Sequence, residues 1–130
     1  MPKLFCDCDD TLVLWLYEEK VVDGYTYFTI PNEGEKYRVN HQLILAIHDY
    51  LTAHLDTILI VWSGGGAEYA GSWARKFFDG VSRVDGIEMK NVKYPQAGDI
   101  CIDDQQLVLN PGVTLMTWQE FVGEYTVVNP

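Results

Sequence analysis

This 130-residue sequence has few cationic side chains and is strongly acidic as a result. Nine lysines and arginines stand against nineteen aspartates and glutamates, a formal net charge of −10. Non-specific binding of nucleic acid or of an anionic membrane needs basic patches, so neither partner is expected. A phosphorylated substrate stays compatible with this charge, because one bound cation reverses the local field of a site.

The sequence also has few cysteines and no long apolar run. Cys6, Cys8 and Cys101 are odd in number, which argues against a disulfide framework and fits a reducing compartment. No apolar run approaches the ~18 residues that a membrane-spanning helix needs, and "MPKLFCDCDD" lacks the apolar core of a signal peptide. We therefore expect a cytoplasmic protein with no membrane partner, folded as a single domain over residues 1–130.

The apolar pattern along the chain predicts strands that alternate with helices. Strands are predicted at residues 3–6, 57–62, 83–89, 99–103 and 113–117. Helices are predicted at residues 40–55, with Asn40 as N-cap, and at 67–78 and 118–125. Turn signals at Gly24 and "PNEG" predict a β-hairpin within residues 21–39. This alternation indicates an α/β fold, with a doubly wound, Rossmann-like parallel sheet of about five strands.

Reactive side chains follow three of the predicted strands. In "LFCDCDDTLVLW", residues 4–15, Asp7, Asp9 and Asp10 interrupt an apolar run; Ser63 begins "SGGG" after the second strand, and Asp103-Asp104 ends another. Carboxyl ends of parallel strands share one edge of a sheet, where ligands bind. Carboxylates brought together there raise one another's pKa or recruit a cation, and Mg²⁺ suits such oxygen ligands.

Each of these segments alone has an ordinary structural explanation. Asp9-Asp10-Thr11 and Asp103-Asp104 are typical of turns and helix caps, and the glycines after Ser63 are typical of a tight turn. Their occurrence together, each at the end of a separate apolar strand, favours a functional site over three unrelated turns.

Three segments also resemble motifs of the haloacid dehalogenase-like (HAD) phosphohydrolase superfamily. "LFCDCDDTLV" is similar to the first motif, an apolar strand followed by Asp-x-Asp-x-Thr. "ILIVWSGG" resembles the second motif and "DICIDDQ" the fourth. The third motif is one lysine ahead of the fourth strand; Lys93 is our first choice for it, and Lys90 is the alternative.

The resemblance implies a Mg²⁺-dependent phosphatase that forms an aspartyl-phosphate. Asp7 would be the nucleophile and Asp9 the general acid and base. Ser63 and the backbone N–H of Gly64 would hold phosphate oxygens, and Lys93 would neutralise charge on the phosphate and on Asp7.

The same resemblance implies a set of metal ligands. They are Asp7, the backbone carbonyl of Asp9, and Asp103, with Asp104 as a further ligand, a water-mediated ligand or a partner of the lysine. An acid at the position of Asp9 argues against haloalkanoic-acid dehalogenation.

The spacing of the motifs leaves no room for the cap domain that many relatives carry. We expect a capless HAD-type fold with a hairpin flap, acting on a phosphorylated small molecule or a nucleic-acid end. The predicted hairpin carries four aromatic residues: Tyr25, Tyr27, Phe28 and Tyr37. Their rings could stack on a base or sugar, but packing against the core is the favoured interpretation.

The same residues favour other functions less. A phosphorylated receiver domain is disfavoured because Ser63 stands where its aspartate would lie, and "SGGGAEYAG" lacks both G-x-G-x-x-G spacing and a P-loop lysine. A HAD-like binding or scaffold protein with little turnover, or a phosphotransferase, remains the alternative.

Overall fold

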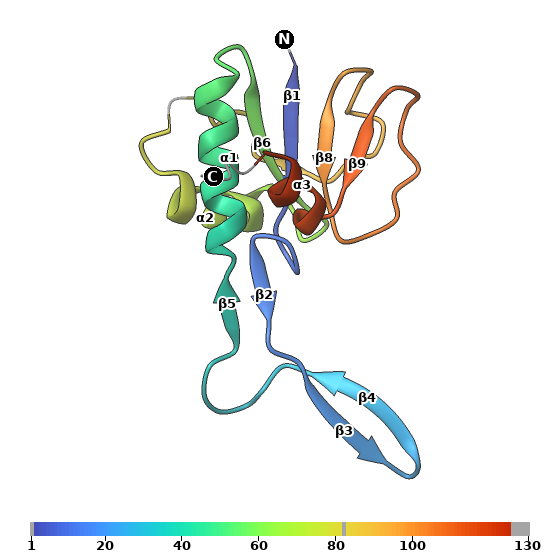
Figure 1. The fold of residues 1–130 in the computed structure, drawn as a ribbon. Helices are drawn as coiled ribbons and strands as arrows, with labels where there is room; N and C mark the ends of the chain where they lie inside the picture. Colours follow the sequence, from blue (N-terminus) through green and yellow to red (C-terminus); the bar gives the residue numbers. More distant parts are fainter. Residues whose placement is uncertain (1, 82, 126–130) are drawn as a thin grey trace.

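A five-stranded parallel sheet forms the centre of the protein (Figure 1). The structure is a computed structural model that describes residues 2–81 and 83–125. The sheet consists of β1 (Lys3–Asp7), β6 (Ile58–Ser63), β7 (Glu88–Met89), β8 (Ile100–Ile102) and β9 (Thr114–Met116). Every neighbouring pair is parallel, in the order β7-β6-β1-β8-β9. The α/β prediction is therefore confirmed.

The order of the strands reverses beside β1. The chain runs outward from β1 through β6 to β7, and then crosses back to β8 and β9 on the other side of β1. Such a reversal opens a crevice at the carboxyl ends of the two strands that flank it. Here these strands are β1 and β8, whose ends carry Asp7 and Asp103.

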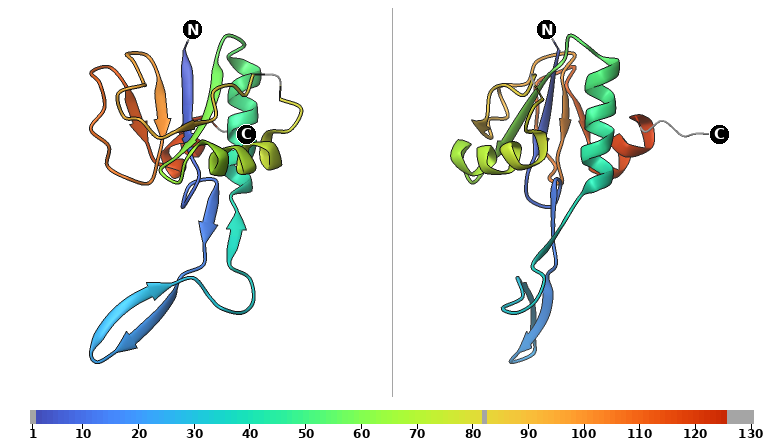
Figure 2. Two further views of the ribbon diagram at one scale, coloured as in Figure 1. Left: turned by 180° about the vertical axis from the view of Figure 1, so that it is seen from behind. Right: turned by 90° about the vertical axis from the view of Figure 1, so that its left-hand side faces the viewer.

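Three helices pack around this sheet: α1 (His41–Ala53), α2 (Ala67–Phe78) and α3 (Trp118–Tyr125). In α1 the side chains of Leu43, Ala46, Ile47 and Leu51 are buried, at the spacing of one helix face. Asn40 caps this helix, as predicted, since its side chain accepts from the N–H of Leu43. Helices α1 and α3 lie on the same side of the sheet (Figure 2).

The two faces of the sheet are covered differently. The larger core joins alternate β1 and β6 residues with side chains from all three helices. The opposite core is a small cluster of Phe5, Ile60, Trp62 and Cys101, against which Leu107 and other residues outside the helices pack. The connections after β7 and β8, residues 90–99 and 103–113, contain no helix. The strand order of a doubly wound sheet is thus present without helices in these two connections.

An antiparallel arm extends away from the sheet between β1 and α1 (Figure 1). Its base pairs β2 (Val13–Trp15) with β5 (Tyr37–Val39), and its tip pairs β3 (Glu18–Val22) with β4 (Tyr25–Thr29). The predicted hairpin is therefore present, and it starts before residue 21. We call residues 13–39 the arm.

The aromatic side chains at the tip of the arm are exposed rather than packed in a core. Tyr25 is 78% exposed, Phe28 66% and Tyr27 45%, so the prediction of core packing is wrong for these three. A two-stranded ribbon buries a side chain only where another layer covers it, and every residue of β3 and β4 except Thr29 is exposed. Tyr37, at the base, packs between Trp15 and Trp73.

None of the helices in the described part of the chain is long and apolar enough to cross a membrane.

Candidate active site

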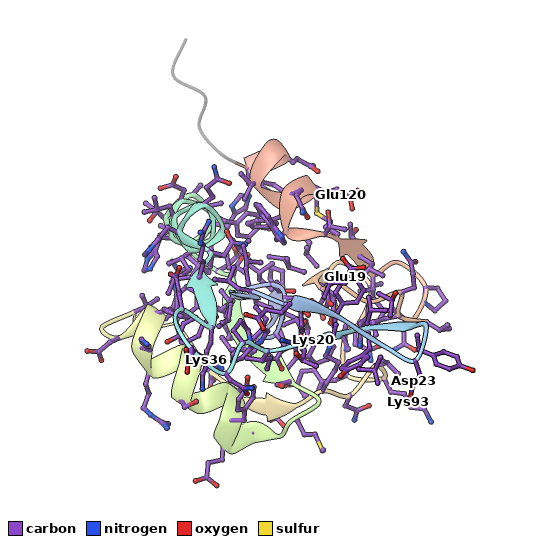
Figure 3. The ribbon with its side chains drawn as sticks, turned by 90° about the horizontal axis from the view of Figure 1, so that it is seen from below. Glu19, Lys20, Asp23, Lys36, Lys93 and Glu120 are labelled. Atoms are coloured by element: carbon purple, nitrogen blue, oxygen red, sulfur yellow. The ribbon has the colours of Figure 1, made fainter. Side chains whose placement is uncertain are left out.

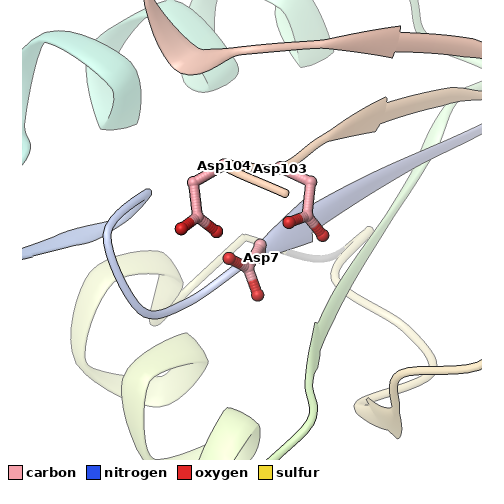
Figure 4. A group of neighbouring side chains, drawn as sticks. All are labelled: Asp7, Asp103 and Asp104. Atoms are coloured by element: carbon pink, nitrogen blue, oxygen red, sulfur yellow. The ribbon is translucent and has the colours of Figure 1, made fainter. Parts of the chain in front are cut away.

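Three carboxylates meet at the point where the strand order reverses (Figure 4). The register pairs Cys6 of β1 with Ile102 of β8, so the next residues, Asp7 and Asp103, lie side by side. Both are buried, whereas Asp104 is exposed. One oxygen from each of the three lies within 4.8 Å of the others. An all-oxygen group of this kind fits a hard divalent cation such as Mg²⁺.

A lysine bridges the two buried carboxylates. The Nζ atom of Lys90 lies 3.0 Å from Oδ1 of Asp7 and 2.8 Å from Oδ2 of Asp103. The backbone also holds Lys90 in place, since its N–H donates to the carbonyl of Ser63 at 3.0 Å. The lysine therefore reaches the site from β7, on the far side of β6.

The lysine that lies beside Asp7 is Lys90, the alternative in our sequence analysis, and not Lys93, the first choice. Strand β7 ends at Met89, so Lys90 emerges at the edge of the sheet where Asp7 lies. The chain then turns, with the N–H of Tyr94 donating to the carbonyl of Asn91. This turn leaves Lys93 exposed, at the periphery of the molecule in Figure 3.

The group carries more negative than positive charge in a place with little water. Burial, and then the neighbouring Asp103, raise the pKa of Asp7 to about 7, although Lys90 opposes this. Burial also raises the pKa of Asp103. Burial alone would lower the pKa of Lys90, but its bonds to the two carboxylates raise it. The lysine is thus held in its charged form, and a second cation would relieve the remaining repulsion.

The loop after β1 is held by one carbonyl. The oxygen of Cys8 accepts from the N–H groups of Thr11, Leu12 and Val13, at 2.9–3.2 Å. Asp10 takes a left-handed conformation, with φ 57°, that aspartate tolerates better than most residues. The Thr11 hydroxyl donates to Oδ2 of Asp7 at 3.2 Å, so this loop also contacts the carboxylate at the end of β1.

Asn40 connects this loop to α1. Its side-chain amide donates to the carbonyl of Thr11 at 2.8 Å, while its Oδ1 caps the helix. Its own N–H donates to the carbonyl of Leu12 at 2.9 Å. One buried side chain therefore joins the start of α1 to the loop that carries the aspartates.

Asp9 lies apart from the three carboxylates. Its side chain is not a member of the Asp7, Asp103 and Asp104 group, so any contact with the same metal is left to its backbone carbonyl. Its Oδ1 accepts from Nε1 of Trp15 at 2.9 Å and from the hydroxyl of Tyr69 at 2.5 Å. Sequence reasoning missed both donors, because Trp15 continues an apolar run and Tyr69 lies 60 residues away in a helix.

Ser63 ends β6 at a glycine turn. Its Oγ accepts from the N–H of Gly65 at 3.0 Å, and Gly66, the N-cap residue of α2, has φ 109°, a conformation that favours glycine. A Cβ on Gly65 would lie 3.2 Å from the Tyr69 ring and 3.4 Å from Oγ of Ser63, whereas a Cβ on Gly64 would meet nothing within 4 Å. The turn before α2 thus has open space at Gly64, where backbone N–H groups can meet an anion.

The three cysteines are buried and unpaired. Burial raises the pKa of the Cys8 and Cys101 thiols to about 12, and it also raises that of Cys6. Neutral buried thiols are poor nucleophiles and poor metal ligands. The reactive groups of the site are therefore its carboxylates, its lysine and the Ser63 hydroxyl.

Comparisons of the chain with protein-family models, with curated proteins and with solved structures found no match.

Proposed function

We propose that this protein is a Mg²⁺-dependent phosphatase of the HAD type, which transfers a phosphoryl group to Asp7 and then to water. The observation that carries the proposal is the position of Asp7: a buried carboxylate at the strand reversal, between Lys90 and Asp103. Ion pairing and burial hold this carboxylate in one orientation, as covalent catalysis by a carboxylate requires.

The reaction has two steps. An oxygen of Asp7 attacks phosphorus, the bond from phosphorus to the leaving oxygen breaks, and that oxygen takes its electron pair together with a proton from Asp9. Asp9 then accepts a proton from water as the water oxygen attacks phosphorus. The bond between Asp7 and phosphorus breaks, which releases inorganic phosphate and restores both aspartates.

The remaining polar groups bind the phosphoryl group. Lys90 pairs with its oxygens and with Asp7, and Ser63 and the N–H of Gly64 donate to it from the turn between β6 and α2. A Mg²⁺ ion would be held by Asp7, Asp103 and Asp104, with the carbonyl of Asp9 as a further ligand. Bound there, the metal supplies positive charge that offsets the charge of the phosphoryl group.

The proposed substrate is a phosphorylated small molecule or a nucleic-acid end. Its phosphate would bind at the carboxyl edge of β1, β6 and β8. The exposed aromatics at the tip of the arm, Tyr25, Tyr27 and Phe28, support a substrate that extends beyond the phosphate, since rings in water are available to stack on a base or sugar.

The test is phosphate release from p-nitrophenyl phosphate and from a phosphorylated oligonucleotide, with Mg²⁺ or with EDTA. The proposal predicts Mg²⁺-dependent turnover that Asp7→Asn lowers by about a thousand-fold or more, as expected for loss of a nucleophile. Asp10→Asn is the matched control. Asp10 lies in the same loop, and among the described residues its carboxylate accepts only from Tyr17. Asparagine also tolerates the left-handed backbone of this position. Turnover that survives Asp7→Asn would overturn the mechanism.

A further inference from the structure

Two aromatic side chains from distant parts of the chain donate to one oxygen of Asp9. We propose that Trp15 and Tyr69 are positioning residues that hold the Asp9 carboxylate for proton transfer, an inference that rests on the function proposed above. Through them, the competence of Asp9 depends on the packing of the arm against α2.

The geometry divides the two oxygens of Asp9 between two tasks. Trp15 Nε1 and the Tyr69 hydroxyl both donate to Oδ1, at 2.9 and 2.5 Å. Among the described residues, no donor reaches Oδ2. Two bonds from different directions fix the rotation of the carboxylate, and Oδ2 is left free to give and accept the proton.

The two donors are themselves held by a row of rings that joins the arm to α2. Trp15 packs edge-on against Tyr37, with ring centroids 5.4 Å apart, and Tyr37 packs against Trp73 at 5.4 Å. Trp73 in turn meets Tyr69 at 6.3 Å. Edge-to-face pairs of this kind orient rings as well as burying them. The row therefore connects β2 and β5 of the arm to the helix that carries Tyr69.

A simpler explanation is that Trp15 and Tyr69 only satisfy their own polar atoms. However, not every indole N–H in the described part of the chain has a hydrogen-bond partner. Buried Nε1 atoms of Trp62 and Trp73 have no hydrogen-bond partner within the described residues. Trp15 and Tyr69 donate to the same oxygen of Asp9, the proposed general acid. This shared partner favours a role for both residues in placing Asp9.

Tyr69 also lies against the proposed phosphate-binding turn. A Cβ on Gly65 would come within 3.2 Å of the Tyr69 ring, and the Gly65 N–H donates to Oγ of Ser63. The ring that holds Asp9 therefore lies beside the turn expected to hold the phosphate. A glycine at position 65 leaves the room for this contact.

The inference predicts a dependence on the leaving group. A general acid matters most for an alkyl phosphate, whose leaving oxygen needs a proton, and least for p-nitrophenyl phosphate, whose leaving group is stable as an anion. General acid catalysis contributes about 10²–10⁴-fold in rate. We expect Trp15→Phe and Tyr69→Phe each to lower kcat on glycerol phosphate by about ten-fold or more, and on p-nitrophenyl phosphate by less than about three-fold.

The experiment compares these two variants with Tyr17→Phe as a matched control. Tyr17 also donates to an aspartate of the same loop, Asp10, at 2.9 Å, but Asp10 has no assigned role in the reaction. Tyr17→Phe should leave the ratio of the two rates unchanged. In an Asp9→Asn background the effect of Trp15→Phe on glycerol phosphate should disappear, since the donor then has no acid to place.

The outcomes separate this inference from the proposed function. Equal losses on both substrates, or losses that persist in the Asp9→Asn background, would overturn the positioning role while Asp7→Asn still abolishes turnover. Absence of turnover by the wild type on both substrates would overturn the proposed function and this inference with it. Tyr69→Phe tests the proposal independently if Trp15→Phe fails to fold.

Discussion

Removal of the Lys90 charge is predicted to destabilise the metal-free protein far more than removal of any exposed charge. The Lys90 side chain is 12% exposed, and its partners Asp7 and Asp103 are 5% and 0% exposed, so water cannot replace the ammonium. Loss of one partner from a buried ion pair costs about 3–5 kcal/mol. We therefore expect Lys90→Met, which keeps the length of the side chain, to lower the free energy of unfolding by about 3 kcal/mol at pH 8.

The cost should be smaller in acid. The pKa of Asp7 is already raised to about 7, from 3.8, by burial and by Asp103. A carboxyl whose pKa is higher in the folded state contributes stability below its unfolded pKa, and loses that contribution as pH rises through the folded pKa. Without Lys90 the pKa of Asp7 rises further, so protonation relieves the buried charge more fully at pH 5 than at pH 8.

The assay is urea unfolding followed by tryptophan fluorescence in EDTA, at pH 5 and pH 8. Lys93→Met is the matched control, because Lys93 is exposed and its loss should change stability by less than about 0.5 kcal/mol. If Lys90→Met and Lys93→Met have equal stabilities at pH 8, the ion pair does not hold the site together and the reasoning is refuted.

Two further predictions concern the metal and the loop that carries the aspartates. Mg²⁺ should raise the melting temperature of the wild type, and EDTA should reverse this rise. Asp103→Asn should lose most of the rise, whereas Asp85→Asn, which changes an exposed residue outside the carboxylate group, should keep it. An equal rise in both variants would place the metal elsewhere. Asn40→Ala removes the cap of α1 and the bond to the Thr11 carbonyl, and should cost about 2 kcal/mol by urea unfolding. Thr52→Ala, which loses one exposed bond to the carbonyl of His48, should cost less than about 0.5 kcal/mol; similar costs for the two variants would contradict the dual role of Asn40.

The sequence predicted most of the sheet, because a parallel strand that is covered on both faces is a continuous apolar run along the chain. "ILIVW", residues 58–62, and "LFC", residues 4–6, are continuous apolar runs, and they lie in β6 and β1. Helix α1 was equally readable, from its apolar spacing and from Asn40. The strand predicted at residues 83–89 is only partly present, since only Glu88–Met89 form a strand and Val84 makes an isolated bridge to Leu59. A short edge strand leaves little pattern to detect.

The arm shows the opposite case. Its tyrosines and phenylalanine are typical of strands, and the hairpin was predicted from them. Their burial could not be predicted, because β propensity describes fit to a pleated surface and not whether another layer covers that surface. In the tertiary structure the arm extends away from the sheet (Figure 1), and Tyr25 and Phe28 remain in water.

The sequence by itself determined that Asp7 and Asp103 follow buried parallel strands, because apolar runs and the acids that end them are adjacent along the chain. Only the tertiary structure decided that Lys90 and not Lys93 meets them, because that depends on where β7 ends beside β6. Only it brought Trp15 and Tyr69 to one oxygen of Asp9. Periodic burial is a local property of a chain, whereas the contact of Asp9 with Tyr69, across 60 residues, exists only once the fold has placed α2 beside the loop after β1.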